Sequence, residues 1–197
     1  MNPDVLLDGD RLRIRETAPT AAGAARERAV PATSVRDTDP DAFPPEIRTA
    51  EGETLFVPAD RRGELERFCA VNRIPRRPRP DVWGDLLEPF SDTGFTADHQ
   101  GATLTRLRRA AGLDADDVAA IRARVGPLVR AYNAVHQDWC HLGLADLLDA
   151  ATADWIPEGL RVAPADRAAF RTWAMRIADL GHGHGPSGGG AVGHPST

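Results

Sequence analysis

The chain has 197 residues and a formal net charge of −5 at pH 7, so it is long enough for one ordinary domain with extra segments and too short for two. The mild acidity argues against a general nucleic-acid or membrane-surface binder, because such proteins are usually basic. All 24 cationic side chains are arginines. This usage indicates codon bias in a GC-rich bacterial genome, so the arginines are poor evidence for phosphate recognition.

Residues 1–17 hold a candidate β-hairpin. Leu12 and Ile14 alternate with arginines after Asp8-Gly9, a dipeptide that supplies the positive φ angles of a tight turn. Residues 18–52 contain few large apolar side chains. We expect them to form a flexible, disordered linker, because they cannot bury enough surface to offset the entropy of ordering.

A single, mainly helical domain is expected over residues 53–180. It opens with a strand candidate, TLFVP, followed by a helix in which Leu65, Phe68 and Cys69 share one face at i, i+3, i+4 spacing. The hairpin or the later Arg/Pro segment would complete a β-α-β start. The expected fold class is therefore mainly α, a bundle-like domain with a small β element.

The second half of the chain carries clear helix punctuation. Asp81 can cap a short apolar helix, Gly112 ends the next helix, and Asp114 begins the one after it. Gly126-Pro127 predicts an interruption and the start of a new helix. A last helix is expected over residues 165–180.

Cysteine usage and both chain ends bear on localisation. Cys69 and Cys140 both sit in apolar helical patterns, so no disulfide framework is expected. The N-terminus lacks the pattern of a signal peptide, and no stretch approaches the ~20 apolar residues of a membrane span. Residues 181–197 form a Gly/His-rich tail that we expect to be disordered. A cytoplasmic protein without a membrane anchor is predicted.

The stretch HQDWCHLGLADLL, residues 136–148, comes closest to a chemical signature. On an ideal helix His136 and Cys140 are neighbours at i, i+4, whereas His141 points roughly opposite to His136. The pair could bind a metal ion, but a zinc site needs three or four ligands, so His99, Cys69 or the neighbourhood of Asp138 would have to contribute.

Two other interpretations of this stretch remain. His136 and Cys140 could be a base and the thiol that it activates, with His99 as a further catalytic candidate. Alternatively, the apolar spacing around Trp139 marks a core helix in which one histidine bonds a neighbouring loop. The helix would then either be buried all round or break near Gly143.

The segment NRIPRRPRP is the most distinctive surface feature that the sequence predicts. It places four arginines among three prolines: Arg73, Arg76, Arg77 and Arg79. A polyproline ligand for a partner domain or a phosphate-contacting arm would fit this pattern. An extended edge segment, whose charges deter strand pairing, fits it equally well.

No phosphate-binding glycine loop, serine nucleophile motif or dinucleotide fingerprint is present, and no cofactor is expected. The leading functional hypothesis is a non-enzymatic interaction or accessory module that binds a protein through the four arginines of residues 73–80. One alternative is a small metal- or thiol-dependent enzyme centred on His136 and Cys140. The other is a protein that contacts nucleic acid through the same Arg/Pro segment, which the negative net charge disfavours.

Overall fold

The computed structural model describes residues 3–16, 26–91, 97–136 and 141–181. Its N-terminal half contains two antiparallel sheets of three strands each. The first sheet has the order β1 (Asp4–Asp8), β2 (Arg11–Glu16) and β3 (Arg26–Pro31), and the second has the order β4 (Val35–Asp39), β5 (Glu46–Thr49) and β6 (Thr54–Phe56).

The hairpin predicted at the N-terminus is present as β1 and β2. Its strands pair with Val5 opposite Ile14, and Gly9 occupies the turn with a φ of 59°. Val5, Leu12 and Ile14 are fully buried, while Arg11 and the other arginines of β2 lie on the exposed face. This alternation fixes the register, because a one-residue slip would expose the apolar set.

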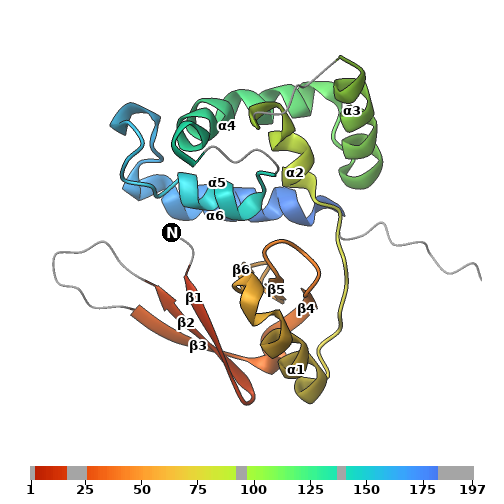
Figure 1. Ribbon diagram of the computed structural model, residues 1–197, viewed down its shortest axis with the longest axis vertical. Coiled ribbons are helices and arrows are strands. Elements are labelled where there is room, and N and C mark those ends of the chain that lie inside the picture. Colours follow the sequence, from red (N-terminus) through yellow and green to blue (C-terminus); the bar gives the residue numbers. More distant parts are fainter. Residues whose placement is uncertain (1–2, 17–25, 92–96, 137–140, 182–197) are drawn as a thin grey trace, which may run out of the picture.

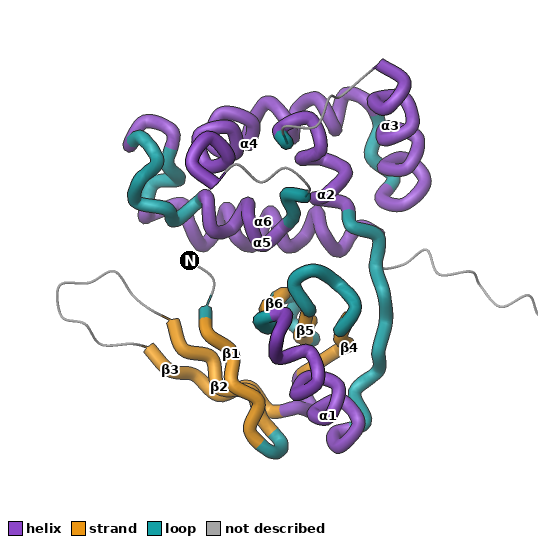
Figure 2. Tube along the Cα trace, viewed as in Figure 1, coloured by secondary structure: helices purple, strands orange, loops and turns teal. Residues whose placement is uncertain are grey.

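Six α-helices follow the sheets in the described part of the chain: α1 (Arg62–Asn72), α2 (Val82–Leu87), α3 (Ala97–Ala111), α4 (Ala115–His136), α5 (Leu144–Ala150) and α6 (Arg167–Ala178). Figure 1 shows α2 to α6 gathered on one side of the molecule, with the sheets and α1 on the other. Figure 2 shows the extended segment, residues 73–81, that connects α1 to this helical half. None of the described helices is both long and apolar enough to cross a membrane.

The helix punctuation read from the sequence is largely confirmed. The Asp81 side chain accepts a hydrogen bond from the Gly84 N–H at the start of α2. Asp114 accepts from two backbone N–H groups at the start of α4, and Gly112 follows α3 with a φ of 71°. These signals succeed because each depends only on residues within one helical turn.

The interruption predicted at Gly126-Pro127 is wrong, because α4 continues through both residues. Pro127 removes one backbone donor from the helix. The surrounding residues compensate by packing, since Val125, Leu128 and Val129 are almost fully buried. Gly126 serves this packing, because a Cβ there would lie only 3.0 Å from the Phe90 ring.

The two halves have separate hydrophobic cores. Residues of the sheets and α1 form one cluster, and residues of α2 to α6 form the other. Phe56, at the end of β6, belongs to the helical cluster. The second sheet therefore contributes one aromatic side chain to the core of the other half.

The predicted fold class, a mainly α bundle with a β-α-β start, is wrong. The strand pairs are antiparallel, and the single parallel contact described, between Thr38 and Arg76, is an isolated bridge. The predicted linker, residues 18–52, is also wrong from residue 26 onward, because β3, β4 and β5 lie there. Residues 18–25 and 182–197 lie outside the described residues.

The linker prediction failed because it counted only apolar side chains. Arg48 and Asp37 are almost completely buried in β5 and β4, at 0% and 1% exposed, and they contact each other. Charged side chains can be buried when they pair. A segment poor in apolar residues can therefore still be ordered.

Candidate functional site

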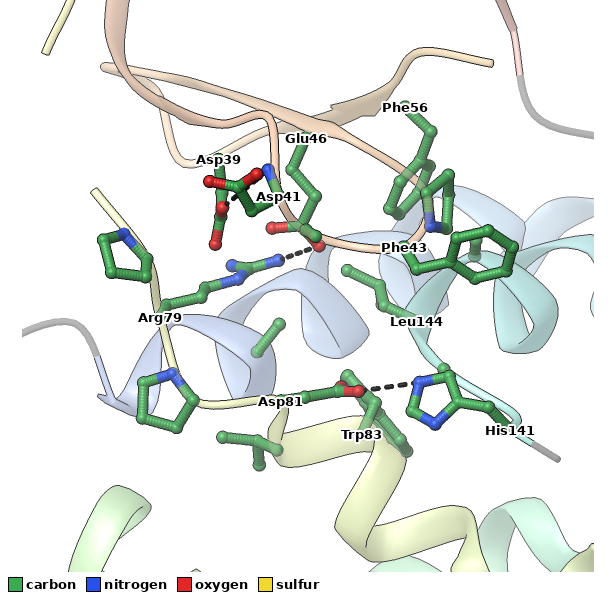
Figure 3. Close-up of a pocket in the computed structure, with 18 residues that line it drawn as sticks. Asp39, Asp41, Phe43, Glu46, Phe56, Arg79, Asp81, Trp83, His141 and Leu144 are labelled. Carbon is green, nitrogen blue, oxygen red and sulfur yellow. Dashed lines mark hydrogen bonds and ion pairs between the residues drawn. The ribbon is translucent and has the colours of Figure 1, made fainter. Parts of the chain in front are cut away.

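A cleft with a volume of about 530 Å³ lies between the second sheet and the helical half (Figure 3). Its walls come from the β4–β5 loop, the extended segment, the start of α2 and the residues before and within α5. The charged side chains that line it are Asp39, Asp41, Glu46, Arg79, Asp81 and His141. Its apolar lining includes Phe43, Pro44, Phe56, Trp83 and Leu144.

The two ends of the cleft differ in character. Figure 3 shows Asp39 and Asp41 at one end, with Phe43 and Leu144 at the other. Phe43 is 77% exposed, an unusual position for a large aromatic side chain. The cleft thus combines a charged end, where Arg79 also lies, with an apolar end.

The extended segment lies along the edge of β4. The Thr38 N–H donates to the Pro75 carbonyl at 2.9 Å, and the Arg77 N–H donates to the Thr38 carbonyl at 2.8 Å. The Pro75 carbonyl and the Arg77 N–H are therefore hydrogen-bonded to β4. This arrangement leaves the prolines that follow, Pro78 and Pro80, to form one wall of the cleft.

Six charged side chains form a closed ring of alternating sign, which we call the ionic ring. In order around the ring they are Arg36, Asp37, Arg48, Glu46, Arg79 and Asp179. Five of the six contacts have N–O distances from 2.8 to 3.3 Å, and the sixth joins Arg48 to Asp37. Three cations balance three anions, so each buried charge has partners of opposite sign.

The ionic ring connects the two halves of the molecule. Four members come from β4 and β5, Arg79 comes from the extended segment, and Asp179 directly follows α6. Burial raises the pKa of Glu46, although Arg79 and Arg48 both favour its carboxylate form. Desolvation outweighs the two cations at this position.

Asp81 and His141 form a second ion pair in the cleft, with 2.8 Å between the Asp81 Oδ2 and the His141 Nε2. Burial alone would raise the pKa of Asp81, but hydrogen bonds from His141 and from the Gly84 N–H outweigh it, so the pKa lies below its usual value. The hydrogen bond to Asp81 raises the pKa of His141 against the effect of burial. Both directions favour the charged pair.

Asp39 differs from the other carboxylates of the cleft. It is only 7% exposed, and it lies directly opposite Glu46 in the register of β4 and β5. The Asp41 N–H donates to its carboxylate at 3.2 Å. Among the described residues, no cation lies within ion-pair distance of Asp39. A largely buried carboxylate that makes no ion pair with the described residues therefore lines the cleft.

The arginines predicted to contact a partner have different environments. The Arg79 side chain is 6% exposed and is bound within the ionic ring. Arg76 is half exposed and contacts Glu66 at 3.2 Å. Arg73 and Arg77 are exposed, and neither side chain contacts a partner in the described part of the chain. A partner-binding role for these four residues stays a prediction.

The candidate catalytic and metal-binding residues are not brought together in the described part of the structure. His99 is exposed on the first turn of α3, and it does not line the cleft. Cys140 and the side chain of His136 lie outside the described residues, so their proposed pairing stays a prediction. The described residues contain no group of three or more His, Cys, Asp or Glu side chains that could hold a metal ion.

The stretch HQDWCHLGLADLL runs from the last residue of one helix to the fifth residue of the next. α4 ends at His136, and α5 begins at Leu144 directly after Gly143. A helix break near Gly143 was one of the two alternatives open from the sequence. His141 lies before α5, where it reaches Asp81 at the start of α2.

Cys69, the other candidate metal donor, is buried in the core of the β half. Its Sγ lies 3.1 Å from the Thr38 Oγ1, and burial raises the pKa of the thiol. A raised thiol pKa suits a small core residue and opposes a nucleophilic role. Cys69 is therefore a structural residue.

Sequence reasoning missed Asp39, Phe43, Glu46 and Asp81 as a group. A signal was present, because Asp37 and Asp39, like Glu46 and Arg48, are two residues apart and so share one face of a strand. The assumption of a disordered linker concealed this pattern. Searches with this chain find no matching family model, no matching curated protein and no matching solved structure.

Proposed function

We propose that the chain is a non-enzymatic module that binds a protein partner, and that the cleft is its binding surface. The observation that carries this proposal is the exposed Phe43 ring at the edge of a cleft that also holds carboxylates. Aromatic side chains are enriched at protein interfaces because they bury a large area at a small entropic cost. In solution the exposed ring has no such burial, and a partner would provide it.

The lining of the cleft favours binding over nucleophilic catalysis. The residues that line it include no Ser, Thr, Cys, Tyr or Lys in the part of the chain that the structure describes. His141 is held by Asp81, and none of the described residues that line the cleft offers a hydroxyl or thiol for it to activate. The described lining therefore offers charge and apolar contact without a hydroxyl or thiol nucleophile.

A cytoplasmic location is part of the proposal. Cys69 is a free thiol, and the described helices include none suited to a membrane. The alternatives of an enzyme centred on His136 and Cys140, and of a nucleic-acid contact through residues 73–80, remain testable. Loss of an activity or of bound metal in Cys140→Ser, with the fold intact, would support the enzyme.

Site-specific photo-crosslinking tests the proposal. The photoreactive analogue p-benzoylphenylalanine would replace Phe43 in one protein and Val71 in the control, since both side chains are 77% exposed and only Phe43 lines the cleft. We expect one discrete protein, identified by mass spectrometry, to crosslink at position 43 and not at position 71.

Competition makes this test specific. An excess of the unmodified chain should suppress the crosslink at position 43, and an excess of Phe43→Ala should suppress it much less. Equal crosslinking at positions 43 and 71, or equal competition by both chains, would contradict a binding surface at the cleft.

A further inference from the structure

The negative charges of the cleft can be assigned to partners one by one. Glu46 is paired with Arg79 within the ionic ring, in which anions and cations are equal in number. Asp81 is paired with His141. Asp41 lies at the edge with its side chain 73% exposed, where water solvates it and Arg62 contacts it at 3.4 Å.

Asp39 is the remaining carboxylate, and its environment is unfavourable for an isolated charge. It is more than nine-tenths buried, and the side chain directly opposite, Glu46, is also a carboxylate. Like charges opposite each other on paired strands destabilise a sheet. Arg79 contacts Glu46, Asp179 and Thr54, and it forms no ion pair with Asp39. The cleft therefore holds one largely buried carboxylate that no cation of the described residues binds.

We propose that the partner supplies this cation as an arginine side chain, with its guanidinium on Asp39 and an adjacent apolar residue on Phe43 and Leu144. This assignment rests on the proposed function, since it takes the partner of the cleft to be a protein. The charged and apolar ends of the cleft (Figure 3) then each receive one side chain of the same short segment.

Two properties of the site favour arginine over other cations. A guanidinium is more weakly hydrated than an ammonium, so it loses less on entering a site that is largely shielded from water. It also binds a carboxylate through two parallel N–H···O bonds, which fixes orientation. A metal ion would need several ligands, and the described residues provide no group of three around Asp39.

A set of matched dipeptides tests the proposal on the full-length protein. The probe is N-acetyl-arginyl-leucinamide, and its controls replace arginine with citrulline, which has nearly the same shape without the charge, or with lysine. Binding is followed through the backbone amide signals of Ala42, Gly143 and Leu144, three residues that line the cleft, and through the indole N–H of the lining residue Trp83, which donates to the Ala174 carbonyl.

We expect the arginine probe to shift these signals and to bind roughly tenfold or more tightly than the citrulline probe, as hydrogen bonds to a charged group imply. In Asp39→Asn this preference should disappear, whereas Glu51→Gln, an exposed carboxylate outside the cleft, should keep it. Equal binding of arginine and citrulline, lysine binding as tightly as arginine, or a preference that survives in Asp39→Asn would each overturn the assignment.

The outcomes separate this inference from the proposed function. A specific crosslink at position 43 without any arginine preference would leave the protein-binding module standing and refute the arginine. An arginine preference that depends on Asp39, together with no specific crosslink, would retain a guanidinium site and refute the protein partner.

Discussion

Replacing Arg79 with Met tests whether the ionic ring holds the two halves together. The substitution keeps the methylene groups and removes a charge that is 6% exposed. Two charge-assisted hydrogen bonds are lost, at 2.9 Å to Glu46 and 2.8 Å to Asp179. Each such bond contributes about 1.5 kcal/mol or more, so we expect a loss of about 3 kcal/mol in the free energy of unfolding. This agrees with the lower end of the ~3–5 kcal/mol measured when one partner of a buried pair is removed.

The lower end is appropriate because both anions retain one arginine each. Glu46 keeps Arg48, and Asp179 keeps Arg36. Urea unfolding would measure the change, and with a slope of about 2 kcal/mol per molar urea the midpoint should fall by about 1.5 M.

Arg77→Met is the matched control for this experiment. Arg77 lies in the same segment, but its side chain is exposed and contacts no partner among the described residues. We expect a change within about 0.5 kcal/mol, as is usual for surface positions. If Arg79→Met were as stable as this control, the ionic ring would contribute nothing to stability. A double-mutant cycle with Glu46→Gln should also show coupling, because the two side chains share a contact.

Three further predictions concern Asp39 and the pair formed by Asp81 and His141. Asp39→Asn should stabilise the free protein by up to about 1 kcal/mol in urea unfolding, because it removes repulsion with the opposite Glu46. The asparagine keeps an oxygen that can accept from the Asp41 N–H. Destabilisation would show that the protein itself compensates the Asp39 carboxylate. The raised pKa of His141 means that its stabilising contribution is complete below its unperturbed value of 6.5 and is lost as pH rises through the raised pKa. The stability difference between the wild type and His141→Gln should therefore shrink from pH 5 to pH 9, and it should stay below about 1 kcal/mol because the histidine is 42% exposed. Gly84→Ala would place a Cβ against Asp81 Oδ2 and 2.7 Å from His141 Cε1, so the pKa of His141, followed by NMR, should fall toward its ordinary value; an unchanged pKa would contradict the pairing.

Local features of the fold could be predicted, and features that join distant residues could not. Asp81, Gly112 and Asp114 were identified correctly because a cap needs only its own helical turn. Pro127 misled the same reasoning, because the packing of α4 against Phe90 outweighs the local signal. Tertiary contacts decide such cases, and a single sequence does not display them.

The cleft illustrates the same limit. Arg36 and Asp179 contact each other although 143 positions of the chain separate them. Arg79, which lies between them in the sequence, also contacts Asp179. The composition of residues 18–52 shows few apolar side chains. Whether a buried charge in this segment finds a partner of opposite sign, however, depends on the complete fold. The histidines and cysteine of residues 136–148 are close together in the sequence itself, whereas the carboxylates of β4 and β5 come together only in the folded sheet.

The presence of two separate cores has a consequence for how the molecule opens. Among the described residues the two hydrophobic clusters are separate, Phe56 of β6 belongs to the helical one, and the ion pairs of Asp179 with Arg36 and Arg79 cross between the halves. A local opening along this boundary would leave both hydrophobic clusters intact, so it should require less free energy than global unfolding. Native-state hydrogen exchange would then resolve two cooperative units, one formed by the sheets with α1 and one by α2 to α6. A partner that contacts both sides of the cleft would make the opening between these two units less frequent. Its binding would therefore be measured as increased protection of the amides at the boundary.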